Sequence, residues 1–243
     1  MVAEHVIVTV KADPECVLGL ATGGTMRPVY AKLRQAATDG DANFGGVTTF
    51  NLDEYVGLAP SHPCSYRHFM SEELFSGAGF SRDRTYVPRG DAPDASEEAA
   101  RYERLIAEHG PIDLQLLGLG INGHIGFNEP MSSLGSRTRI KTLTRATREA
   151  NSRFFADGEE PPQQAVTVGI QTILESCEII LLVTGQNKAT AVAQMVEGPL
   201  AALCPATALQ LHPNVTVVLD REAASKLQFT DYYSEVHSGG REA

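Results

Sequence analysis

Long apolar runs and an excess of basic residues are both missing from this sequence. No apolar run approaches the roughly 20 residues of a membrane-spanning helix, so we expect no membrane span. The formal net charge is −10 and no basic cluster stands out, which makes nucleic acid and anionic membranes poor partners. An anionic small substrate is still compatible with this charge, because a local group of Arg and Lys can override it.

Cysteine is scarce, and its spacing is that of neither a disulfide framework nor a zinc site. Cys16, Cys64, Cys177 and Cys204 are scattered, with no CxxC pair. The first fifteen residues, MVAEHVIVTVKADPE, carry an acidic residue before their apolar run and no small-residue cleavage site, so we expect no signal peptide. Both patterns predict a cytoplasmic protein with reduced thiols and no metal.

The chain also lacks internal repeats and low-complexity linkers. Its 243 residues fit one large α/β domain or two small ones, and an apolar fraction of 42% is ample for a core. The polar stretch DGEEPPQQ (157–164) has the composition of a surface loop, not of a domain boundary. We therefore expect a single α/β catalytic domain over residues 1–243.

Short apolar runs alternate with longer amphipathic ones, which predicts an α/β fold. Strands separated by helices favour a three-layer arrangement, with a mostly parallel sheet and helices on both faces. The stretch AVTVG (165–169) is too short to assign. The expected strands are 16–21, 46–55, 112–120, 178–185 and 214–220, and the expected helices are 26–37, 96–110, 144–155, 170–177 and 187–198.

Ligands of such sheets bind outside the carboxyl ends of the strands, where this sequence has polar clusters. The loop ATGGT (21–25) lies between a strand and a helix, and its glycines free backbone N–H groups to face an anion. A plain tight turn explains the motif equally well. In VTGQNKA, Lys188 opposes the dipole of the helix that it starts, which indicates a bound anion or a solvated surface lysine.

Two further clusters carry groups suited to proton transfer. Asp53 and Glu54 end the run TTFNLDEY, where a carboxylate can act as a base or merely close a strand-end turn. In GLGINGHIGFNEP, His124 can serve as a base or as an acid, Glu129 can orient it, and Asn122 can accept from its ring. A structural glycine-rich loop explains neither this polar group nor its place after a strand, so we favour chemistry here.

The stretch LGLGINGHIGFNEP resembles the signature of the glucosamine-6-phosphate deaminase family. Other segments resemble that family in the same order over residues 16–237: LGLATGGT, TFNLDEYVGL, HPCSYRHFM, SSLGSRTRIKTLT, ANSRFF, TVGIQTIL and LQLHP. The 6-phosphogluconolactonases share the fold but continue differently after GH and lack FNEP. The family usually has a longer N-terminal helical segment than the EHVIVTVKADP found here.

The resemblance implies conversion of glucosamine 6-phosphate and water to fructose 6-phosphate and ammonia, with no metal or organic cofactor. His124, held by Glu129 and Asn122, would open the sugar ring, and Asp53 would carry a proton from C2 to C1. Many members have Asp where this chain has Asn122, which can orient the imidazole but cannot stabilise its charged form by charge. The substrate phosphate would meet Thr22, Gly23, Gly24, Thr25 and Lys188, and Arg153 would close on it from a mobile segment around 136–155.

The resemblance also implies regulation. Ser132, Arg139, Lys141 and Thr142 match positions that bind the activator N-acetylglucosamine 6-phosphate between subunits of allosteric members, and Tyr232 matches a tyrosine that completes that site. A solvated basic strand is the alternative from spacing alone. We therefore expect a homohexamer whose states differ in the 136–155 segment.

Two rival functions remain at this stage. One is a lactonase, or an isomerase that keeps the nitrogen, on the same fold. The other is a sugar-phosphate-sensing module without turnover, which usually carries a DNA-binding segment, and we expect none before residue 16.

Overall fold

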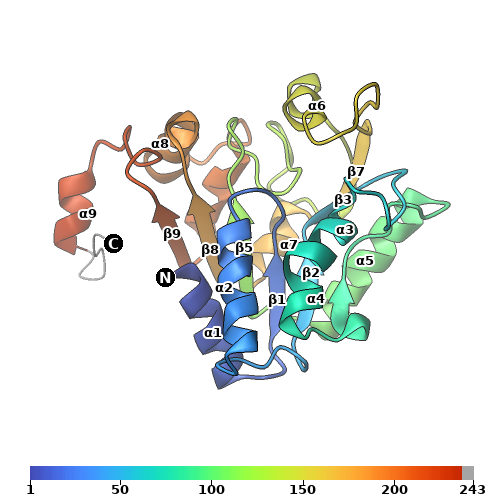
Figure 1. Ribbon diagram of the computed structural model, residues 1–243. Coiled ribbons are helices and arrows are strands. Elements are labelled where there is room, and N and C mark those ends of the chain that lie inside the picture. The colour runs from blue at the N-terminus through green and yellow to red at the C-terminus, as the bar shows by residue number, and fades with distance from the viewer. Residues whose placement is uncertain (237–243) are drawn as a thin grey trace.

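The computed structural model describes residues 1–236, and its centre is a six-stranded parallel sheet (Figure 1). The strands follow the order β4-β2-β1-β5-β8-β9, and every neighbouring pair is parallel. Their bounds are β1 Val17–Leu20, β2 Thr48–Asn51, β4 Thr85–Tyr86, β5 Leu114–Gly118, β8 Glu178–Val183 and β9 Val215–Leu219. The predicted α/β class and parallel sheet are confirmed.

Helices cover both faces of this sheet, as predicted. α2 contacts both α1 and α4 in front of the sheet in Figure 1, while α5 and α7 lie behind it. A short 3-10 segment, η4, contacts both α7 and α8. The bounds are α1 Val2–Ala12, α2 Arg27–Thr38, α3 Tyr66–Met70, α4 Ser76–Ala78, α5 Ala95–His109, α7 Ile170–Leu174, α8 Ala189–Glu197, η4 Pro205–Leu211 and α9 Thr230–Val236. No helix within residues 1–236 is long and apolar enough to cross a membrane.

The predicted strand over residues 46–55 was wrong in one respect, because it is two strands in two sheets. The chain changes partners at Leu52, whose N–H donates to Leu20 while its carbonyl accepts from Val168. Beyond it, β3 (Asp53–Tyr55) joins a small antiparallel sheet of order β3-β7-β6 with β7 (Gln164–Thr167) and β6 (Arg139–Thr142). The stretch that the sequence left unassigned thus supplies the central strand β7.

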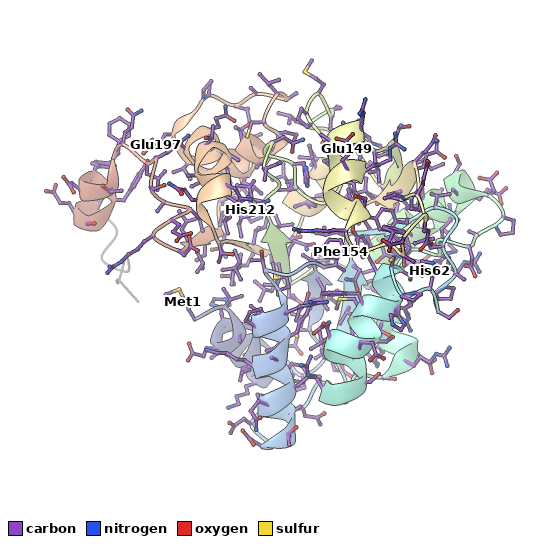
Figure 2. The ribbon with its side chains drawn as sticks, turned by 45° about the horizontal axis from the view of Figure 1, so that its top comes forward. Met1, His62, Glu149, Phe154, Glu197 and His212 are labelled. Atoms are coloured by element: carbon purple, nitrogen blue, oxygen red, sulfur yellow. The ribbon has the colours of Figure 1, made fainter. Side chains whose placement is uncertain are left out.

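Helix α6 (Arg145–Ser152) follows β6 and lies over the carboxyl ends of the large sheet (Figure 1). Figure 2 brings this side forward, with Glu149 on α6 and Phe154 and His62 near its C-terminal end. The segment is tethered there, since Asn151 Nδ2 donates to the Tyr55 hydroxyl at 2.8 Å and Cys64 Sγ donates to the Phe154 carbonyl at 2.9 Å. The predicted helix over 144–155 is therefore real but ends earlier.

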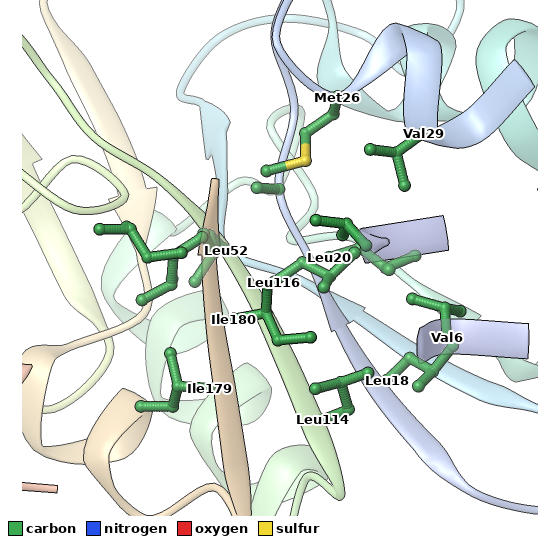
Figure 3. Packing of buried hydrophobic residues seen from close by; sticks show 14 of the residues in the cluster. Val6, Leu18, Leu20, Met26, Val29, Leu52, Leu114, Leu116, Ile179 and Ile180 are labelled. Atoms are coloured by element: carbon green, nitrogen blue, oxygen red, sulfur yellow. The ribbon is translucent and has the colours of Figure 1, made fainter. Parts of the chain in front are cut away.

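The core lies between the large sheet and its helices (Figure 3). Side chains of β1 and β5 alternate across the sheet, and Leu18, Leu20 and Leu114 are almost fully buried. Figure 3 shows Val6 of α1 and Val29 of α2 on the side toward which Leu18 and Leu20 point. This packing holds β1 and β5 rigidly, so the loops that follow them leave from fixed points.

The order of the strands identifies where a ligand binds. From β1 the chain builds outward through β2 and β4, and then returns to β5 and builds the other way through β8 and β9. The crevice at such a switch point, here between β1 and β5, is the usual binding site of an open parallel sheet.

Candidate active site

Three loops leave the carboxyl edge side by side, because β1, β5 and β8 are neighbours. They are the loop 21–25 before α2, the long loop 119–131 after β5, and the turn Gln186–Lys188 after β8. Gly23 has a φ of 104°, and a Cβ built at Gly23, Gly24 or Gly118 meets no atom within 4 Å. The switch point therefore has open space in front of exposed backbone, flanked by the half-buried Thr22 and Thr25.

Two cations from different elements lie close enough for one to affect the pKa of the other. Burial lowers the pKa of Lys188, and the charge of Arg153 lowers it further. Arg153 follows α6, far from Lys188 in sequence, and its guanidinium lies 4.7 Å from the centre of the Phe154 ring. Two like charges held near each other favour an anion between them, which is what the predicted phosphate site requires.

The long loop forms a relay of three side chains that ends on His124. Glu129 Oε2 accepts from Asn122 Nδ2 at 2.8 Å, and Asn122 Oδ1 accepts from His124 Nδ1 at 2.7 Å. Since the amide nitrogen of Asn122 faces the carboxylate, its oxygen faces the ring, and the ring proton lies on Nδ1. The Nε2 atom of His124 is then left with a lone pair that can take and return a proton.

Glu129 is held as a carboxylate although its side chain is buried. Burial acts to raise the pKa of Glu129, but His124, Thr147 and Asn122 hydrogen-bond or lie close to it and together lower the pKa to about 2. Oε1 accepts from the hydroxyls of Thr144 and Thr147, on the first turn of α6. The relay thus rests on a fixed negative charge.

Asp53 lies at the start of β3, 6% exposed, and burial followed by the charge of Glu54 raises its pKa to about 8. The loop of His124 approaches it at Gly126, where a built Cβ lies 3.4 Å from Asp53 Oδ2 and 3.2 Å from Thr167 Oγ1. With a φ of 55°, that position suits glycine and no larger residue. A carboxylate of raised pKa therefore lies against the loop that carries the histidine.

Sequence reasoning named Glu54 without finding its partners, and it did not single out Thr167. Glu54 is 1% exposed and accepts from the Ser65 hydroxyl at 2.7 Å and from the N–H groups of Tyr66 and Arg67 at 3.0 Å, so it fixes the start of α3. Thr167 Oγ1 accepts from Phe127 N at 3.1 Å and supports the histidine loop. In the sequence, the only sign of these partners is Ser65, a residue type that often precedes a helix.

The predicted effector residues are only partly brought together. Ser132 is 2% exposed, and its hydroxyl has no partner among the described residues. Arg139, Lys141 and Thr142 lie on β6, at the edge of the small sheet. Tyr232 lies on α9, 59% exposed, on the opposite side of Figure 1 from α6 and β7. Within one chain, Tyr232 does not complete the predicted site.

The long loop that carries His124 is nevertheless connected to β6. Arg139 Nη1 donates to Asn128 Oδ1 at 2.9 Å, and Asn128 Nδ2 donates to the carbonyls of Ile125 and Val168. Arg139 thereby braces the turn that lies between His124 and Glu129. Residues 1–236 contain no group of three His, Cys, Asp or Glu side chains arranged to hold a metal ion.

Most of the chain is similar to proteins of a known family. The family described as Glucosamine-6-phosphate isomerases/6-phosphogluconolactonase matches residues 1–218. The chain belongs to this family. Within it, the chain is 52% identical over 234 residues to a glucosamine-6-phosphate deaminase of Cellvibrio japonicus, covering 96% of this chain and 89% of the relative. A Streptomyces avermitilis deaminase is 48% identical over 240 residues, covering 98% and 92%.

Two solved structures resemble the chain to different degrees. A monomeric glucosamine-6-phosphate deaminase superimposes with a TM-score of 0.89 at 46% identity, covering 92% of both chains. A 6-phosphogluconolactonase from Trypanosoma cruzi gives 0.75 at 18% identity, covering 93% of this chain and 91% of its own, and shares the fold alone.

Proposed function

We propose that this protein is an enzyme, a glucosamine-6-phosphate deaminase that converts glucosamine 6-phosphate and water to fructose 6-phosphate and ammonia in amino-sugar breakdown. The observation that carries the proposal is the approach of the His124 loop to Asp53 at Gly126. The loop that carries an acid–base histidine therefore lies against a separate carboxylate, and ring opening followed by proton transfer requires both groups. Relatives that are about half identical and carry this activity support the same reading.

Ring opening is assigned to His124. Its Nε2 takes the proton of the anomeric hydroxyl and delivers it to the ring oxygen, so that the C1 carbonyl forms as the ring bond breaks. The relay from Glu129 through Asn122 keeps the other ring nitrogen protonated and the ring oriented. The fixed charge of Glu129 also stabilises the imidazolium between the two transfers.

Isomerisation and deamination are assigned to Asp53. Its carboxylate takes the proton from C2 of the open aldose while O1 gains a proton, which gives an enolamine. It then returns the C2 proton to C1 while the nitrogen loses a proton. The resulting imine at C2 adds water and releases ammonia, leaving the ketone of fructose 6-phosphate. A base whose pKa lies near the working pH suits a group that must both take and return a proton, and the pKa of Asp53 is raised by burial to about 8.

The phosphate is assigned to the loop 21–25 with Lys188 and Arg153. The backbone at Gly23 and Gly24, just before α2, borders open space, and the charge of Arg153 lowers the pKa of Lys188, so these two cations lie near each other. Arg153 follows a helix tethered mainly by side chains, which supports closure of the 136–155 segment over bound substrate.

The effector site is a finer proposal. Ser132 with a buried, unpartnered hydroxyl and Lys141 and Thr142 on an edge strand support a phosphate site for N-acetylglucosamine 6-phosphate. Because Tyr232 is remote within one chain, that site requires a neighbouring subunit, and a homohexamer remains our expectation. The similar monomeric deaminase argues for the opposite outcome. We keep the cytoplasm as the expected location.

The testing experiment is a coupled assay of the purified protein for ammonia release from glucosamine 6-phosphate. Equimolar ammonia and fructose 6-phosphate is the expected result. Hydrolysis of 6-phosphogluconolactone without ammonia release would instead assign the chain to the lactonases. Binding of glucosamine 6-phosphate without any product would favour the sensing module.

A further inference from the structure

Helix α6 contacts the catalytic relay directly. Thr147 is only 8% exposed, and its hydroxyl donates to Glu129 Oε1. The hydroxyl of Thr144, which caps the same helix, makes a longer contact of 3.3 Å to that oxygen. The catalytic carboxylate is therefore held by a segment that arrives from outside its own loop.

The two oxygens of Glu129 have separate tasks. Oε2 accepts from Asn122 and leads to His124, while Oε1 accepts only from the two α6 threonines among the described residues. A carboxylate rotates about one bond, so a partner on one oxygen fixes the direction of the other. The hydroxyl of Thr147 consequently determines where Oε2 meets Asn122.

We propose that Thr147 is a positioning residue for the acid–base histidine, acting through Glu129 and Asn122. Since Arg153 follows the same helix, α6 in its observed place both completes the relay and presents a cation to the phosphate site. This inference rests on the proposed function, because it assigns Thr147 a part in that reaction.

A purely structural role is the alternative. The N–H of Thr147 donates to Thr144 Oγ1 at 3.2 Å, so the residue also belongs to the helix cap. Loosening the end of α6 that precedes Arg153 would weaken phosphate binding and raise KM. Losing the orientation of Glu129 would instead lower kcat, because the relay acts only in chemistry.

The experiment compares three variants of the full chain with wild type. Thr147→Val removes the hydroxyl and keeps the shape, and we expect kcat to fall about 10-fold with KM within about twofold of wild type. Thr147→Ser retains the hydroxyl and should restore kcat. Asn151→Ala removes the hydrogen bond to Tyr55 at the opposite end of α6, next to Arg153, and leaves Thr147 in place. It should therefore raise KM while kcat is retained. Thermal unfolding checks that each variant is folded.

The titration of Glu129 itself gives an independent readout. Without the Thr147 donor the pKa of Glu129 rises from about 2, so an NMR pH titration of the Glu129 carboxyl should give a higher pKa in Thr147→Val and an unchanged one in Asn151→Ala. If Thr147→Val does not fold, Thr147→Ala replaces it and must show the same loss of kcat and the same shift.

Two failures are distinguishable. If wild type releases no ammonia from glucosamine 6-phosphate, the proposed function is wrong. If wild type is active and the hydroxyl-free variant keeps full kcat, or matches Asn151→Ala in KM and kcat, the positioning role alone is wrong. A Thr147→Ser variant as slow as Thr147→Val would also overturn it.

Discussion

Asp53 holds a carboxylate where water scarcely reaches it. Its raised pKa has one main cause, burial, with the charge of Glu54 second. Apart from the family resemblance, the sequence indicated Asp53 only by its place at the end of a strand with polar residues, which many structural aspartates share. Its burial depends on the loop at Gly126 and on Thr167 of β7, both distant in sequence, so no local pattern could predict it.

For Asp53→Asn we expect kcat to fall at least about 10³-fold with little change in substrate binding. The amide cannot take the C2 proton, and a base of this kind typically contributes about 10²- to 10⁴-fold. Initial-rate kinetics and a separate binding titration with glucosamine 6-phosphate make the measurement. Turnover within a few-fold of wild type would remove Asp53 from the mechanism.

The same variant should change stability in a pH-dependent way. Because the folded pKa of Asp53 is raised from 3.8 to about 8, the wild type loses stability as pH rises through this window, while asparagine loses none. Asp53→Asn should therefore gain more than about 1 kcal/mol relative to wild type between pH 4 and pH 8, since one pKa unit corresponds to about 1.4 kcal/mol. Urea unfolding at the two pH values measures the free energy of unfolding of both proteins. The same difference between variant and wild type at both pH values would contradict the raised pKa of Asp53.

At the scale of elements, the parallel strands were predictable and the small sheet was not. Strands such as β5 and β8 are buried on both faces and appear as continuous apolar runs bounded by helices. β3, β6 and β7 have three or four residues each, and β3 pairs with β7 across more than 100 residues. The first helix, α1, carried a signal that went unread, since Val2, Val6 and Val10 are buried at a spacing of four.

The proposed phosphate site combines three elements, the loop before α2, the turn after β8 and the end of α6. We expect Lys188→Ala and Arg153→Ala each to raise KM about 10- to 100-fold with kcat largely kept, because each removes one charge-assisted contact made in ground and transition states alike. Initial-rate kinetics with inorganic phosphate as a competitor measure this.

A matched control is available near the start of α8. Lys226 donates to Thr190 Oγ1 at 2.7 Å on the surface, and Lys226→Ala should leave KM unchanged. An unaltered KM in both Lys188→Ala and Arg153→Ala would locate the phosphate elsewhere.

For the whole molecule, the open question is whether chains assemble around the effector residues. We expect sedimentation to give a hexamer and N-acetylglucosamine 6-phosphate to lower the apparent KM by roughly 5- to 150-fold, the usual range of coupling between sites. Lys141→Ala is the cleaner test variant, because Arg139 also braces the catalytic turn through Asn128. A monomer with a hyperbolic, unactivated response would exclude this regulation.

The most direct test of the account follows the proton itself. Glucosamine 6-phosphate carrying deuterium at C2 is converted in ordinary water, and the fructose 6-phosphate is examined by mass spectrometry and NMR. A single shielded carboxylate predicts one ammonia per product and a substantial share of the deuterium at C1, with neither product from Asp53→Asn. Ammonia release with no deuterium at C1, or undiminished turnover in that variant, would contradict it.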